Sequence, residues 1–130
     1  MEAAVERLAA LVFLVTGLSH LLAPRAWVRL FAAFAAQGES AGLLNGLLHL
    51  PLGLAIAAFH PVWKGPGLAI TLIGWALLAK ATAQLSFPRL AERSLALAAG
   101  EGAEARLRLA GLVSLAVGSA IAWVAWGAGA

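Results

Sequence analysis

The side chains of this chain that could do chemistry are a few polar groups inside long apolar stretches. Asn45 and His49 lie four residues apart, and Lys80 and Gln84 repeat that spacing in the next apolar stretch. Side chains four residues apart share one face of a helix. An amide, an imidazole and an ammonium group could hydrogen-bond a polar ligand, and the imidazole or the amine could move a proton.

Thr16 and His20 add a hydroxyl and a second imidazole from the first apolar stretch. Counted from the helix ends, most of these polar residues sit in the same half of the membrane. Polar groups inside a membrane are the usual place to look for function. If the faces converge, they form a polar vestibule whose candidate binding residues are Asn45, His49, Lys80, Gln84, Thr16 and His20.

Each of these residues also has a purely structural interpretation. Lys80 lies about six residues, or about 9 Å at helical rise, from the inner end of its helix, so it could snorkel to the headgroups. The alternative is that Lys80 lines a pocket that binds an anion or a polar headgroup. Asn45 and His49 could join neighbouring helices by hydrogen bonds, and His20 could be an interfacial residue.

Metal chemistry lacks the residues that it needs, and only His49 and Lys80 are candidates for acid–base chemistry. The chain contains no cysteine, and no acidic residue lies within any of its apolar stretches. Bis-histidine haem needs two histidines at one depth, whereas His20 and His49 differ by about 7 Å at helical rise. No carboxylate supports either imidazole as a ligand. We therefore predict no catalytic residue, no metal site and no cofactor.

Four apolar stretches must position the polar side chains, and they fill most of the 130 residues. The chain is 62% hydrophobic and 12% charged, with a mean hydropathy of +0.91, whereas about 25% of residues are charged in soluble domains. A hydrocarbon core of about 30 Å needs roughly 20 apolar residues as helix. The sequence therefore predicts one all-α membrane domain over 1–130, with transmembrane helices at 9–22, 41–59, 67–87 and 107–126.

The first apolar stretch is predicted to be a retained helix and not a signal peptide. Its leader carries Glu2 and Glu6 against a single Arg7, and no clear cleavage site precedes Pro24. We expect this helix to begin near Val5 and to be somewhat short.

Two connections have the pattern of short helices that lie in the membrane interface. Over residues 25–36, aromatic and apolar side chains recur at helical spacing, while Arg25 and Arg29 fall on the opposite side. Residues 88–99 are again helical and partly basic. We therefore expect each connection to lie along the membrane surface.

Local signals mark the limits and the packing of the second span. Ser40 is expected to be its N-cap, and Pro51 lies in its interior. Narrow faces of small residues on the second and fourth spans predict close helix packing, either within the bundle or between subunits. These faces carry Gly42, Gly46 and Gly53 on the second span and Gly111 and Gly118 on the fourth.

The two halves of the chain resemble each other. Pro24, Arg25 and Arg29 match Pro88, Arg89 and Arg93 at an offset of 64 residues and, after one inserted residue, Glu39, Gly46 and Gly53 match Glu104, Gly111 and Gly118. Chance is the alternative, because Ala and Leu fill both halves. A duplication predicts two tandem hairpins, 1–63 and 64–130, each made of a span, an interfacial helix and a span and related by an axis along the membrane normal.

The distribution of basic residues predicts the orientation. The first and third connections hold Arg25, Arg29, Arg89, Arg93, Arg106 and Arg108, whereas the termini and the second connection hold Arg7 and Lys64. This asymmetry places the first and third connections in the cytoplasm and both termini outside, in a bacterial inner membrane. The net charge of +3 is explained by anionic lipid headgroups and not by nucleic acid, because the basic residues flank apolar spans.

One part of the chain has a family resemblance. The segments AFHPVW at 58–63 and ITLIGW at 70–75, followed by Lys80, resemble small four-helix bacterial inner-membrane proteins that are DoxX-like in size and layout. The resemblance covers roughly residues 49–88, where His60 and Trp63 suit an outer interfacial turn. It implies a compact four-helix bundle and brings no substrate, cofactor or catalytic residue.

Three functions follow as expectations. The first is a small integral membrane protein without catalytic chemistry, which has an accessory or interaction role. The second is an oligomeric transporter or channel around a cytoplasm-facing vestibule, and the third is a membrane enzyme that binds a lipid or a quinone. The expected partners are membrane lipids and either further copies of the chain or another membrane protein, with no nucleic acid.

Overall fold

The computed structural model describes residues 1–127, which form helices and connections without any β-strand. Two helices are short and the others have 20 or 21 residues. The α-helices are α1 (Glu2–Leu22), α2 (Pro24–Ala35), α3 (Glu39–Phe59), α4 (Gly67–Ser86), α5 (Pro88–Ala99) and α6 (Ala103–Ala122), and a π-helix (Trp123–Gly127) continues α6.

Four of these helices are long and apolar enough to cross a membrane. They are α1, α3, α4 and α6 together with its π-helical extension. The mean hydropathy over the most apolar 18 residues of each is 1.5 to 1.8. Large apolar side chains such as Leu72 and Leu109 lie on their outer faces, more than half exposed. In a bilayer such side chains face hydrocarbon at no cost, so the fold is consistent with a multi-pass membrane protein.

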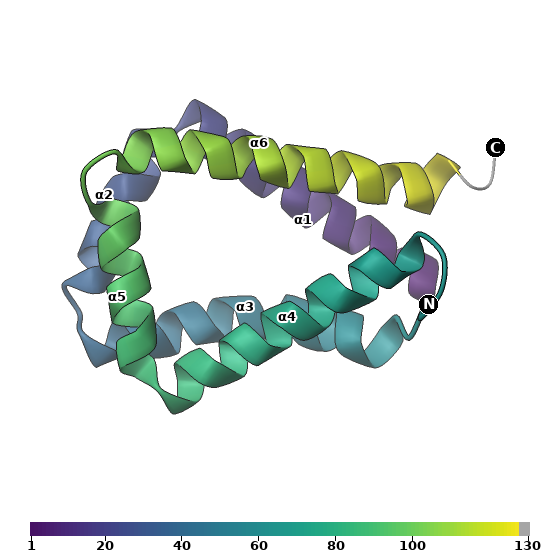
Figure 1. Ribbon diagram of the computed structural model, residues 1–130, viewed down its shortest axis with the longest axis horizontal. Helices are drawn as coiled ribbons and strands as arrows, with labels where there is room; N and C mark the ends of the chain where they lie inside the picture. The colour runs from purple at the N-terminus through teal and green to yellow at the C-terminus, as the bar shows by residue number, and fades with distance from the viewer. Residues whose placement is uncertain (128–130) are drawn as a thin grey trace.

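The long helices form two packed pairs (Figure 1). α1 packs along α6, and α3 packs along α4. The pairs come together where α1 begins and where α3 turns into α4, and at the opposite end α2 and α5 pack on each other across the bundle. Each of the two units predicted from the sequence thus contributes one long helix to each pair.

Proline and glycine residues set the boundaries at the α2/α5 end. Single residues, Ala23 and Phe87, separate the long helices from the short ones, and each is followed by a proline at the first helical position. Proline suits that position because its missing N–H would have no helical partner there. Gly38 and Gly102, which precede α3 and α6, have φ values of 60° and 71°, a region that glycine enters without a steric penalty.

Two predicted boundaries were wrong. α1 begins at Glu2 and has 21 residues, so it starts before Val5 and is not short. The charged leader is the first turn of this helix, in which Glu2 suits the positive end of the helix dipole. Ser40 does not cap α3, because the N-cap is Gly38 and no side chain bonds to the helix start.

Glycines allow the paired helices to approach closely. A Cβ atom built on Gly53 would lie 2.7 Å from the backbone nitrogen of Leu78, and one on Gly118 would lie 2.9 Å from the backbone nitrogen of Leu14. Only glycine leaves room at such distances. The narrow faces therefore pack within the chain, which is one of the two alternatives that the small residues predicted.

The buried core lies where the two pairs meet. Small and β-branched side chains from all four long helices fill it, with Phe13, Leu52 and Ile73 packed against them. Its buried members are Val5, Ala9, Ala10, Ile56, Ile70 and Ile121. Because this core occupies one end of the bundle, the helix pairs are free to separate toward the other end.

We predict that Gly53→Ala and Gly118→Ala each destabilise the fold by about 1–2 kcal/mol, because overpacking against backbone outweighs the gain in helix propensity. The measurement is loss of helical circular dichroism on titration with sodium dodecyl sulfate. Gly100→Ala is the control, since its Cβ would be 3.5 Å from the nearest atom. An equal response of all three variants would contradict the role given to the close contacts.

Candidate ligand-binding cavity

A cavity of about 970 Å³ lies between the two helix pairs and is lined by all six helices. Its volume is at the upper end of the range for ligand sites, about 300–1,000 Å³. All six polar residues singled out from the sequence line this cavity, namely Thr16, His20, Asn45, His49, Lys80 and Gln84. The faces that the sequence placed on separate helices therefore converge.

The wall made by α3 and α4 carries a chain of hydrogen bonds. His49 Nδ1 lies 2.7 Å from the carbonyl oxygen of Asn45, one helical turn earlier. A carbonyl only accepts, so Nδ1 carries the proton and Nε2 is the acceptor. Lys80 Nζ, 3.0 Å from Nε2, donates to it. The Lys80 side chain thus reaches across to α3.

An amide pair completes this wall. The Asn45 side-chain nitrogen donates to Gln84 Oε1 over 3.2 Å. Together with His49 and Lys80 these residues form one hydrogen-bonded cluster, the α3/α4 polar cluster. It holds the imidazole in one tautomer and fixes the position of the ammonium group, which is how a binding site is preorganised.

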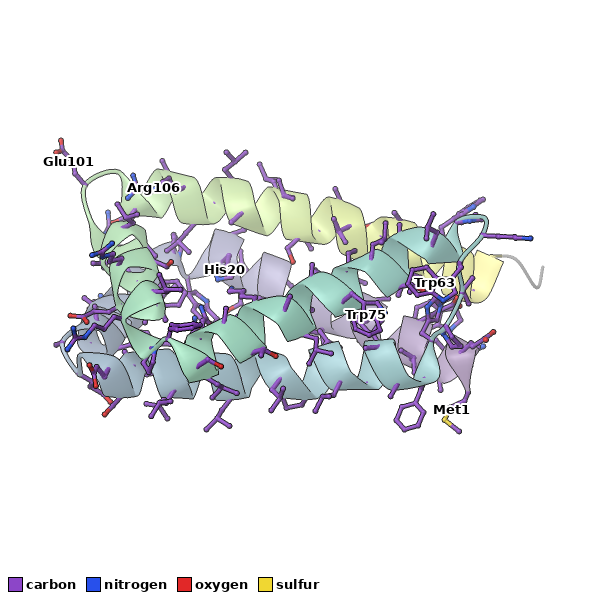
Figure 2. All side chains as sticks on the ribbon, turned by 60° about the horizontal axis from the view of Figure 1, so that its bottom comes forward. Met1, His20, Trp63, Trp75, Glu101 and Arg106 are labelled. Carbon is purple, nitrogen blue, oxygen red and sulfur yellow. The ribbon has the colours of Figure 1, made fainter. Side chains whose placement is uncertain are left out.

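The opposite side of the cavity is less polar. The Ser114 hydroxyl donates to the carbonyl oxygen of Phe13 over 2.7 Å, which ties α6 to α1. His20 lies between the helix pairs (Figure 2), with its ring centroid 4.5 Å from that of Trp27. Both ring nitrogens of His20 are shielded from solvent without any hydrogen-bond partner among residues 1–127.

The rest of the lining is mostly apolar. The short helix α2 turns its aromatic and leucine side chains into the cavity and leaves Arg25 and Arg29 exposed. The apolar lining residues on α1, α2 and α3 include Leu8, Val12, Phe13, Trp27, Leu30, Phe31, Phe34, Leu48 and Leu52. The cavity therefore offers a large apolar surface and one polar cluster.

The lining of the cavity combines hydrogen-bonding groups with two imidazoles and an amine. No acidic residue lines the cavity, so a carboxylate is not on hand for acid–base chemistry. Among residues 1–127, no three His, Asp or Glu side chains lie together in a group that could hold a metal ion. What the polar cluster can do is donate hydrogen bonds to the head of a ligand.

Sequence reasoning missed a second polar network, at the end where the helix pairs meet. His60 is completely buried, although an interfacial position beside Trp63 was expected for it. Its Nε2 lies 3.0 Å from Glu6 Oε1 and its Nδ1 lies 3.0 Å from Thr71 Oγ1. The Thr71 oxygen is also 2.8 Å from the carbonyl oxygen of Val62.

This His60 network ties the start of α1 to the α3–α4 connection. The ionised Glu6 carboxylate only accepts, so His60 Nε2 donates to it. The available signal was Glu6 itself, an acidic residue on an apolar helix that needs a partner when it is buried. A single sequence does not say that the partner stands 54 positions away.

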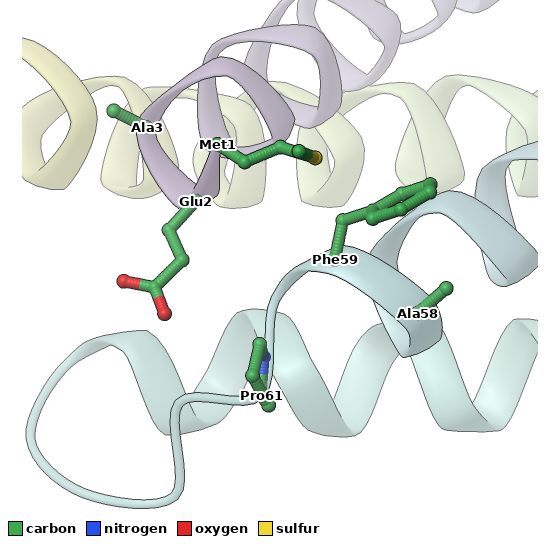
Figure 3. A pocket seen from close by; sticks show the side chains of 6 residues that line it. All are labelled: Met1, Glu2, Ala3, Ala58, Phe59 and Pro61. Atoms are coloured by element: carbon green, nitrogen blue, oxygen red, sulfur yellow. The ribbon is translucent and has the colours of Figure 1, made fainter.

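A smaller hollow of about 570 Å³ lies at the same end (Figure 3). It lies between the first residues of α1 and the end of α3, and Glu2 supplies its one charged side chain. The lining residues are Met1, Glu2, Ala3, Ala58, Phe59 and Pro61. With a single exposed carboxylate and no second polar side chain, this hollow offers little to recognise a ligand.

No protein-family model matches the chain, and no curated protein or solved structure matches it. The resemblance to DoxX-like membrane proteins therefore stays a prediction.

We predict that Glu6→Ala destabilises the fold by about 1–3 kcal/mol, because the buried Nε2–H of His60 loses its acceptor. Glu2→Ala, on the same helix but exposed, is the matched control and should change stability by less than about 0.5 kcal/mol. Unfolding in sodium dodecyl sulfate, followed by circular dichroism, measures both. Equal stability of the two variants would argue against a structural role for the network.

Proposed function

We propose that this chain is a membrane protein that binds an amphiphilic small molecule of the lipid or quinone class in the cavity between its helix pairs. The observation that carries the proposal is the cavity of about 970 Å³, apolar over most of its lining and bordered on one wall by the α3/α4 polar cluster. A ligand with a hydrocarbon body and a polar head complements both parts.

The other two expected functions have less support. A purely accessory role gives no reason for a cavity of this size or for the unpartnered nitrogens of His20. The oligomeric transporter or channel needs further copies of the chain to complete its path, because within one chain the His60 network and the buried core fill the end where the pairs meet. Binding requires neither a partner protein nor a continuous path.

We also propose that the fold arose by duplication of a unit made of a span, a short helix and a span. Ion pairs support this, since Arg25 binds Glu104 at 3.2 Å and Arg89 binds Glu39 at 2.8 Å. Arg25 corresponds to Arg89 and Glu104 corresponds to Glu39, so the two ion pairs are the same contact made once from each half. The glycine contacts support it as well, because the contact of Gly53 with Leu78 corresponds to that of Gly118 with Leu14.

The proposed orientation has α2 and α5 at the cytoplasmic surface of a bacterial inner membrane, as interfacial helices, and the termini outside. Its support is the excess of arginine at the α2/α5 end and the exposed Trp63, Trp123 and Trp126 at the other end. Cytoplasmic loops are enriched in basic residues, and tryptophan suits the membrane interface.

We predict that Ala110→Phe, which places a ring in the cavity, reduces retention of a co-purified amphiphile at least tenfold. Leu109→Phe is the control, because Leu109 is 62% exposed on the outer face of the same helix. Native mass spectrometry of protein released from a mild detergent measures the bound mass, and extraction identifies it. Full retention of the ligand by Ala110→Phe, with the fold intact, would rule the cavity out as the binding site.

The chain contains no cysteine, so single-cysteine variants report orientation cleanly. We predict that a membrane-impermeant maleimide labels Lys64→Cys, in the α3–α4 connection, on intact spheroplasts. The same reagent should label Glu101→Cys, in the α5–α6 connection, only after lysis, since this residue is expected in the cytoplasm. The reverse labelling pattern would invert the proposed orientation.

A further inference from the structure

The positive charge of Lys80 has no counter-charge among the described residues 1–127. Lys80 supplies the one lysine, arginine or acidic side chain among the residues that line the cavity. Its nearest polar partner is His49, which offers a lone pair and no negative charge, because the proton on Nδ1 is committed to Asn45. Lys80 is exposed in the structure, so the cost of its charge comes from its place within a membrane-spanning helix, where an unpaired charge meets hydrocarbon.

The glutamates of the chain are placed elsewhere. The chain has six acidic residues in total, all of them within the described part. Three of these are bonded to other groups, since Glu6 binds His60, Glu39 binds Arg89 and Glu104 binds Arg25. The others are Glu2, Glu92 and Glu101, and none of them lines the cavity.

We infer that the ligand of the cavity is an anionic amphiphile, whose carboxylate or phosphate head pairs with Lys80 on the α3/α4 wall. The inference rests on the proposed function and names the charge of its ligand. The ammonium group has three protons and spends one on His49, so further donors remain for anionic oxygens. Such charge-assisted hydrogen bonds are about twice as strong as neutral ones.

The rest of the α3/α4 polar cluster suits the same head. The Asn45 amide and the Gln84 amide are 3.2 Å apart, and a primary amide has two N–H donors, of which this bond uses one on Asn45. This wall therefore offers several hydrogen-bond donors and no carboxylate. A cationic head would meet Lys80 with like charge, and a neutral head would leave the charge unbalanced.

The difference between the two sides of the cavity also determines the orientation of the ligand. Under the proposed duplication, Thr16 occupies the position on α1 that Lys80 occupies on α4. Hydroxyl and ammonium thus stand at corresponding places, and only the α3/α4 wall is cationic. The head therefore lies at that wall, and the hydrocarbon tail lies against the leucine and aromatic side chains of α1 and α2.

The experiment compares the binding of four ligands that share a sixteen-carbon tail and differ in their head group. The protein is first stripped of lipid and is kept in a non-ionic detergent at pH 8. The probes are hexadecanoic acid, hexadecyl phosphate, hexadecanol and hexadecylamine, and native mass spectrometry measures the bound fraction of each. We expect at least one of the two anions to bind at least tenfold more tightly than the alcohol and the amine. The stronger anion tells whether the source is a fatty acid or a phosphorylated lipid.

Lys80 is tested by two matched variants. Lys80→Gln keeps a hydrogen-bond donor and removes the charge, so it should abolish the preference for the anion, whereas Lys80→Arg should keep it. Ala110→Phe should remove binding of every probe, which separates the cavity from anionic lipid held by arginines at the membrane surface. Circular dichroism confirms that each variant is folded, and the wild-type comparison stands if one is not.

The outcomes separate the inference from the proposed function. Equal binding of the alcohol and both anions by the wild type would overturn the inference and leave the proposed amphiphile site intact. A preference for an anion that persists in folded Lys80→Gln would also overturn it, because the counter-charge would then come from another residue. Failure of all four probes to bind would instead overturn the proposed function.

Discussion

The structure depends on the close approach of long helices at glycines. Hydrocarbon gives apolar helices no reason to associate, so packing contacts and polar bonds must hold the bundle together. At Gly53 and Gly118 the neighbouring backbone lies where a side chain would otherwise stand. Because the contacts join α3 to α4 and α1 to α6, they produce two closely packed helix pairs and not four helices that are all packed equally closely. A cavity can then lie between the pairs without loosening either of them.

What holds the two pairs together differs between the ends. At one end, the buried core and the His60 network bring all four long helices into contact. At the other end, α2 and α5 cross the bundle, and exposed ion pairs join each short helix to the start of a long one. Exposed ion pairs contribute at most about 1 kcal/mol each. The cavity thus has a firmly packed end and an end closed mainly by the apolar faces of the short helices.

The polar groups of the cavity are also largely bonded to one another. Each side chain of the α3/α4 polar cluster has at least one partner, and Lys80, Asn45 and Gln84 keep spare donors. Spare donors on a membrane-spanning helix gain from a polar partner, because hydrocarbon offers none. A ligand that brings oxygen atoms and negative charge would supply one. This is why the proposed site is a binding site, and why its inferred ligand is anionic.

The sequence by itself determined the four apolar helices, the two short helices between them and the face that each polar side chain shares with its neighbour. Hydropathy and helical spacing carry that information locally, as the pair Asn45 and His49 illustrates. Only the tertiary structure decided which helices pair, that Lys80 meets His49 instead of extending to the headgroups, and that Glu6 reaches His60. These contacts join residues far apart in the chain, and nothing local in one sequence specifies a distant partner. The cavity, too, was decided only by the tertiary structure, because its walls exist only once the helix pairs have packed.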